Sequence, residues 1–228
     1  MADDGPSFDR PGIGFATEVL APGGIAWEQG LPDYTRDRQD GVRSEQYVAD
    51  SLLRVGLGAN LELQLGSDSY AWLHEGGAHT HGGGDSHVAL KLQLPSQQDS
   101  FSWAVLGTYT VPTGKPALSD GGHARELGVT GAWDLAQGRS VSLYADYEDD
   151  DQGHTWTFSP SYTFYDDTRF SSYVEAGLST GTEHDRVAGA GGIWKLSDAV
   201  QLDLSFLRGL TAASPDWQAG FGVAFAFR

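Results

Sequence analysis

The sequence contains no cysteine, and it contains no run of 18 or more consecutive apolar residues. The first absence excludes disulfide bonds but says little about the compartment, because many exported proteins have none. The second excludes a membrane protein built from transmembrane helices, since each such helix needs about 20 apolar residues. No signal peptide is visible either, because Met1–Asp4 is neither basic nor apolar. We therefore interpret the chain as a mature sequence with Met1 added for expression.

Basic residues are also scarce: 14 Lys and Arg stand against 31 Asp and Glu, which gives a net charge of −17. This balance argues against a nucleic-acid-binding protein, because such proteins need a basic surface. The acidity has two readings. It can reflect solvated loops, or it can reflect an acidic mouth or lumen that disfavours anions.

Aromatic residues and glycine are abundant, with 7 Trp, 9 Tyr, 10 Phe and 31 Gly. The end of the chain shows how they are arranged. Aromatic or apolar residues occupy every second position from Trp217 to Phe227, and small or polar residues lie between them. Segments of about ten residues with this alternation are typical of a transmembrane β-barrel, in which the apolar positions face lipid.

The same alternation recurs along most of the chain and predicts twelve strands. Polar connections separate them, including residues 36–41 and a Gly/His-rich loop over 74–86, and longer connections mostly alternate with shorter ones. The predicted strands are 25–31, 53–57, 61–72, 88–94, 101–111, 127–133, 141–147, 156–164, 170–178, 188–196, 200–206 and 217–227.

We therefore predict an all-β fold: a transmembrane antiparallel up-and-down β-barrel of about 12 strands, with short periplasmic turns and longer extracellular loops. Residues 1–22 lack a clean period, and we expect an irregular N-terminal segment that is periplasmic or partly in the lumen. Residues 23–228 form the barrel domain.

The aromatic residues also suggest two bands, one at each membrane interface. The alternative is that they fill the core of a β-sandwich. Beside the short turns we place Trp103, Trp133, Tyr165 and Trp194. Nearer the long loops we place Trp27, Tyr47, Tyr109, Tyr147, Trp156 and Trp217.

If the apolar positions face lipid, the residues between them line the lumen. The candidates are Arg54, Glu62, Gln64, Lys91, Gln93, Glu126, Thr130, Asp134, Tyr144, Asp146, Glu148, Tyr173, Glu175, Gln201 and Asp203. Charges enclosed by the barrel must pair or stay hydrated, and Arg54 and Lys91 flank the strand that carries Glu62 and Gln64, which predicts cross-strand pairing. Many other inward positions are small, which indicates a narrow passage; the alternative is a lumen that side chains fill completely.

Several segments, taken in order, resemble one known family. They are residues 15–27, 51–57 with 61–63, Asp85 with 88–94, 111–114, 173–175, and 201–203 with 209–210. They resemble the outer-membrane channel family named after the meta-pathway of phenol degradation. The resemblance implies a monomeric channel of twelve strands that takes up small hydrophobic or aromatic compounds. It names no substrate-contacting residue.

Metal binding and catalysis have weak signals. His74, His79, His81 and His87 are candidate Zn or Cu ligands, but the glycines around them favour weak, adventitious binding. The acidic run 148–151 is either a solvated loop or a Ca²⁺ site, or it contacts lipopolysaccharide through divalent cations. No Ser/His/Asp arrangement has a recognisable local setting, so we predict that the protein is not an enzyme and has no cofactor.

We therefore expect a bacterial outer-membrane channel for passive uptake of small hydrophobic or aromatic molecules, with Tyr109, Tyr144 and Tyr173 stacking on flat solutes near the mouth. Its expected partners are the lipid bilayer, lipopolysaccharide and the solute, with no nucleic acid. The alternatives are a small-channel porin for hydrophilic or cationic solutes, an envelope barrel without transport, and a soluble β-sandwich or lipocalin-like binder.

Overall fold

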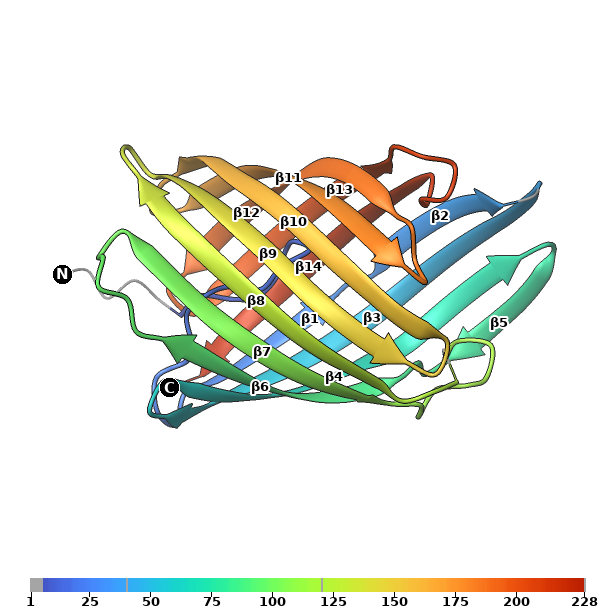
Figure 1. Cartoon of the computed structure of the whole chain (residues 1–228), viewed down its shortest axis with the longest axis horizontal. Coiled ribbons are helices and arrows are strands. Elements are labelled where there is room, and N and C mark those ends of the chain that lie inside the picture. The colour runs from blue at the N-terminus through green and yellow to red at the C-terminus, as the bar shows by residue number, and fades with distance from the viewer. Residues whose placement is uncertain (1–5, 40, 120, 228) are drawn as a thin grey trace.

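The computed structural model describes residues 6–39, 41–119 and 121–227, so the interpretation of Met1 lies outside the described residues. The described residues form strands that wrap into a barrel (Figure 1). Within these three ranges, no helix is long and apolar enough to cross a membrane. The strands are β1 (Ile25–Gly30), β2 (Asp33–Gln39), β3 (Val42–Gly58), β4 (Leu61–Glu75), β5 (Ala78–Gly82), β6 (Ser86–Leu94), β7 (Phe101–Val111), β8 (Ala124–Leu135), β9 (Arg139–Asp150), β10 (Gly153–Asp166), β11 (Phe170–Gly181), β12 (Arg186–Ser197), β13 (Val200–Gly209) and β14 (Trp217–Phe227).

These fourteen segments make twelve barrel strands, which confirms the predicted fold. All pairings are antiparallel, and β1 and β2 both pair with β3 on one side and β14 on the other. They are therefore one strand, interrupted at Leu31 and Pro32. In the same way β5 and β6 both pair with β4 and form one strand. The pairing of the first strand with β14 closes the barrel. Among the described strands, β5 pairs with β4 alone.

Two segments that the sequence assigned to loops are strands instead, so those predictions were wrong. Residues 36–39 belong to β2, and the predicted loop 74–86 contains the end of β4, a tight turn at Gly76 and Gly77, and β5. The φ angles of these two glycines are 54° and 88°, which favours glycine in a two-residue turn. The apolar alternation is lost here because both faces of these hairpins contact water. Figure 1 shows both hairpins at the end opposite the chain termini.

The barrel is apolar on the outside and charged on the inside, the reverse of a water-soluble core. Leu127 and Leu204, in the apolar alternation of β8 and β13, are 62% and 61% exposed. The largest fully buried side chains of the described residues are charged, namely Arg54, Lys91, Glu28 and Glu62. This distribution is that of a lipid-facing barrel and not of a β-sandwich.

The aromatic bands lie where the sequence placed them, with one exception. Trp27 lies directly opposite Phe225 in the pairing of β1 with β14, and the two rings stack with their centroids 5.9 Å apart. Phe225 is close to the C-terminus, so Trp27 belongs to the band at the termini and not to the band near the long loops. The error arose because the first strand does not end at Leu31 but continues as β2.

Candidate functional site

The N-terminal segment, residues 6–24, lies inside the barrel and makes no regular secondary structure. Carboxylates of the barrel wall accept hydrogen bonds from its backbone. The Ile13 N–H donates to Glu175 Oε2 at 3.0 Å, and the Leu20 N–H donates to Glu62 Oε2 at 2.8 Å. An irregular segment is stable in an enclosed place only when its polar backbone groups find partners. The wall carboxylates supply some of these partners.

A buried charge network joins this segment to one side of the wall. The Arg54 guanidinium bridges two wall carboxylates, at 2.8 Å from Glu28 and 2.7 Å from Glu62. The Lys91 ammonium lies 2.6 Å from Asp9 of the segment. The side chains of Arg54, Glu28, Glu62 and Lys91 are completely shielded from solvent. Arg54 and Glu62 thus pair across two strands as the sequence suggested, whereas Lys91 pairs with the segment.

The ionisation of Asp9 follows from these neighbours. Burial alone would raise the pKa of Asp9, but the charges of Arg54 and Lys91 outweigh it and hold that pKa below its ordinary value. The Gln64 amide also donates to Asp9, at 2.7 Å. Asp9 therefore carries the negative charge that balances Lys91.

Arg10 makes a second ionic anchor for the segment. Its guanidinium donates two hydrogen bonds to Asp33, at 2.9 and 3.0 Å, and lies 3.2 Å from Asp50 and 3.5 Å from Asp203. Burial alone would lower the pKa of Arg10, but these carboxylates raise it above its ordinary value. The backbone oxygen of Arg10 also accepts a hydrogen bond from the Gln201 amide at 2.9 Å.

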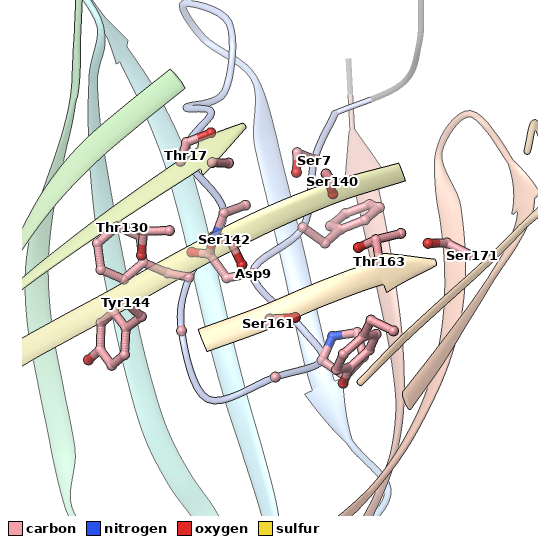
Figure 2. Close-up of a pocket in the computed structure, with 18 of the residues that line it drawn as sticks. Ser7, Asp9, Thr17, Thr130, Ser140, Ser142, Tyr144, Ser161, Thr163 and Ser171 are labelled. Atoms are coloured by element: carbon pink, nitrogen blue, oxygen red, sulfur yellow. The ribbon is translucent and has the colours of Figure 1, made fainter. Parts of the chain in front are cut away.

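The opposite side of the lumen is not filled. Strands β7 to β12 and the N-terminal segment enclose a cavity of about 360 Å³ (Figure 2). Asp134, Asp166 and Glu175 bring carboxylates to its wall. The rest of the wall is rich in small hydroxyl side chains: Ser102, Thr130, Ser140, Ser142, Ser159, Ser161, Thr163 and Ser171. The lumen therefore has a filled, charged side and an open, hydroxyl-lined side.

A small apolar cluster borders this cavity. Phe15 of the segment packs edge-on against Tyr144 of β9, with ring centroids 5.7 Å apart, and Ala104 is buried with them. Gly14 allows this approach, because a Cβ at that position would lie 2.8 Å from the Cβ of Tyr144. The segment thus places an aromatic ring at the side of the open half.

A second cavity, of about 470 Å³, lies nearer the end with the protruding hairpins. The connection after β7 folds over it, because the Ser119 hydroxyl and the Gly114 N–H both donate to Asp85, each at 2.9 Å. His87 and Asp68 also line this cavity. Its lining is mainly polar.

The predicted lumen residues occupy three kinds of position. Three of them are half-buried: Gln93, Glu126 and Glu148. Asp134 is exposed near the end of β8. The others are buried: Arg54, Glu62, Gln64, Lys91, Thr130, Tyr144, Asp146, Tyr173, Glu175, Gln201 and Asp203.

The prediction that Tyr109 stacks on solute near the mouth was wrong. Its ring stacks on His123 at 5.5 Å, and it shares the outer face with the lipid-facing positions of β7.

Glu28, Asp9 and Arg10 were not predicted from the sequence. Glu28 had a usable signal, because it follows Trp27 and therefore lies on the inward side of the alternation. Asp9 and Arg10 had none, since an irregular segment has no period from which its contacts can be inferred.

The four candidate histidines do not converge. His74 and His79 lie opposite each other in the β4–β5 hairpin with ring centroids 4.2 Å apart, whereas His87 lines the second cavity. His81 stands opposite Trp72 in the same hairpin. Among the residues that the structure describes, no group of three or more His, Asp or Glu side chains is arranged to hold a metal ion.

The acidic run 148–151 has a structural role. Asp150 Oδ1 accepts hydrogen bonds from the backbone N–H groups of Gln152 and Gly153, at 2.7 and 2.8 Å. The carboxylate therefore closes the turn between β9 and β10.

Comparisons with known proteins agree with this geometry. Residues 8–227 match the family model described as "Putative MetA-pathway of phenol degradation". The crystal structure of an outer membrane channel from Pseudomonas putida F1 is similar with a TM-score of 0.72 and 15% identity, over 96% of this chain and 99% of that one. The KdgM porin is similar with a TM-score of 0.59 and 10% identity, over 90% of this chain and 99% of that one.

The translocator domain of the autotransporter NalP from Neisseria meningitidis is a more distant neighbour. Its TM-score is 0.53 at 15% identity, over 91% of this chain and 90% of that domain. At such identities the solved structures show that the fold is shared. No curated protein matches the sequence.

Proposed function

The chain belongs to the family of the MetA pathway of phenol degradation, and from this premise we propose that it is a passive channel for small solutes. The barrel lies in the bacterial outer membrane, with its apolar face toward lipid and its polar face toward the lumen. No energy source is required, because solutes diffuse down their own concentration gradient.

The observation that carries the proposal is the cavity beside the N-terminal segment. A barrel of about eight strands has an interior that side chains fill, whereas a barrel of twelve strands encloses more space. Here β7 to β12 present hydroxyl groups to the lumen, and a space of about 360 Å³ remains. The small wall residues support a passage on this side of the segment.

The lining also suggests a class of solute. Phe15 and Tyr144 place aromatic rings at the edge of the cavity, and the serine and threonine hydroxyls both donate and accept hydrogen bonds. Asp134 and Glu175 repel anions. We therefore propose that the preferred solutes are small aromatic molecules that carry a hydroxyl group and are uncharged or cationic.

Permeation into vesicles tests this proposal. Tyramine and 4-hydroxyphenylacetate share a phenol ring but carry opposite charges, so the lipid bilayer alone passes both slowly. Vesicles with the protein should take up tyramine about tenfold faster than empty vesicles, with a much smaller gain for 4-hydroxyphenylacetate. Equal uptake with and without protein, for both solutes, would remove the transport proposal.

A cation channel without aromatic preference is the second candidate. Its support is a group of carboxylates on the inner face of β8 and β9. Glu126 and Glu148 lie directly opposite each other, and Asp146 lies opposite Gly128, the next inward position of β8. Ethanolamine has the charge of tyramine without the ring. If it permeates as fast as tyramine, the second candidate is favoured.

A further inference from the structure

Several arginines lie on the outer face of the barrel, at the end opposite the termini. Arg36 of β2 and Arg208 of β13 both lie directly opposite Trp217 of β14, in the aromatic band of that end. The Tyr34 ring packs against the same tryptophan with centroids 4.6 Å apart. Because Tyr34 and Arg36 are two residues apart on one strand, both point outward.

Three more arginines extend this group across neighbouring strands. Arg38 lies opposite Arg43 in the β2–β3 pairing, one outward position beyond Arg36. Arg186 is two residues from Ala188, which lies opposite Arg208. We name Arg36, Arg38, Arg43, Arg186 and Arg208 the arginine arc. It runs over β3, β2, β13 and β12, which are adjacent in the sheet apart from β14 between β2 and β13.

Much of this positive charge is not neutralised by the protein. The guanidinium groups of Arg38, Arg186 and Arg208 make no hydrogen bond or ion pair with any described residue. Arg36 has a long contact with Asp216, at 3.9 Å, and lies directly opposite Glu45 in the β2–β3 pairing. Arg43 pairs with Glu45. The arginine arc therefore keeps positive charge on the surface of a chain whose net charge is −17.

The other end of the barrel differs. Arg139 donates to its own turn, through the Ala136 carbonyl at 3.2 Å and the Gln137 side chain at 3.1 Å. Lys195 lies 4.0 Å from Asp166. Arg139, Arg169 and Lys195 lie at this end, against the five residues of the arginine arc at the other. A partner that exists on only one side of the membrane fits this asymmetry.

Phosphate is the group that such a site recognises. Guanidinium groups bind phosphate oxygens through two parallel hydrogen bonds, and they do so better than ammonium groups. Aromatic bands lie at the level of lipid head groups, and arginines beside them reach head groups by extending along the surface. The outer leaflet of the outer membrane consists of lipopolysaccharide, whose lipid A anchor carries phosphates at this depth.

We propose that the arginine arc binds the phosphates of lipid A. This places the end opposite the termini outside the cell. The proposal rests on the outer membrane location but not on the identity of the solute.

Binding of purified lipids to the detergent-solubilised protein, measured by native mass spectrometry, tests the proposal. The wild-type protein should retain diphosphoryl lipid A and lose about tenfold in affinity when both phosphates are removed from the lipid. Arg186→Gln/Arg208→Gln should lower the affinity for diphosphoryl lipid A by about tenfold. The matched control Arg139→Gln/Arg169→Gln, which removes the same charge at the other end, should bind as the wild type does.

Three results would overturn the proposal: equal binding by the two double variants, no dependence on the phosphates, or equally tight binding of phosphatidylglycerol. A heat-dependent shift in gel mobility establishes that each variant has folded. Neither pair lines the lumen, so tyramine uptake should match the wild type in both. A failure of lipid binding is therefore distinct from a failure of transport.

Discussion

Replacing Arg54 with leucine is expected to lower the free energy of unfolding of the barrel by about 3–5 kcal/mol. The guanidinium bridges Glu28 and Glu62, and all three side chains are fully buried. Without the guanidinium, the carboxylates of Glu28 and Glu62 lie close to each other and to Asp9, and the positive charge that neutralises them is gone. Urea unfolding in lipid vesicles, followed by tryptophan fluorescence, measures the change.

Two further variants test the cause of this effect. Arg125→Leu removes an exposed arginine of β8 and should change the free energy of unfolding by less than about 0.5 kcal/mol. Arg54→Leu/Glu28→Gln/Glu62→Gln removes the uncompensated charges as well as the guanidinium, so it should recover most of the lost stability. If the triple variant is as unstable as Arg54→Leu, lost packing and not unpaired charge explains the result.

Removing residues 6–17 is expected to raise the single-channel conductance by about two- to threefold, because the lumen of a twelve-stranded barrel is wider than the passage that the segment leaves. The deletion removes Asp9, Arg10 and Phe15, so water can enter the filled side and hydrate Lys91 and Arg54. Recordings in planar lipid bilayers measure the conductance. An unchanged value would show that the segment does not restrict the passage.

A disulfide provides the control for this deletion. The Thr17 and Ser102 hydroxyl oxygens are 2.6 Å apart, and the chain has no cysteine of its own. Thr17→Cys/Ser102→Cys should therefore join the segment to β7 when oxidised. If solutes pass between the segment and the wall of β7 to β12, the locked protein should conduct as the wild type does. Closure on oxidation would show instead that the segment must move.

The sequence predicted the strands well wherever lipid is present on one side and the lumen on the other. That boundary forces apolar and polar residues to alternate, as they do from Trp217 to Phe227. Beyond the bilayer the constraint disappears. The residues around Arg38 and His79 form β-hairpins, but water surrounds both faces, so no alternation marks them as strands.

The contacts of the N-terminal segment were not predictable for a different reason. Asp9 meets Lys91 across 82 positions of sequence, and Ile13 meets Glu175 across 162. Neither contact follows from local periodicity, because the segment has none. The sequence did place Lys91 and Glu175 on the inner face, and an inner face crowded with charges demands partners. Only the structure shows that the segment supplies some of them.

The proposed transport function requires a passage between the N-terminal segment and the wall of β7 to β12. Ser161→Cys introduces the only thiol of the protein into this wall, and the matched variant Ser96→Cys places it in the exposed connection between β6 and β7. In planar bilayers, a bulky thiosulfonate reagent should abolish most of the single-channel current of Ser161→Cys, with recovery after reduction, and should leave Ser96→Cys unaffected. An undiminished current through fully labelled Ser161→Cys would show that solutes do not pass along this wall.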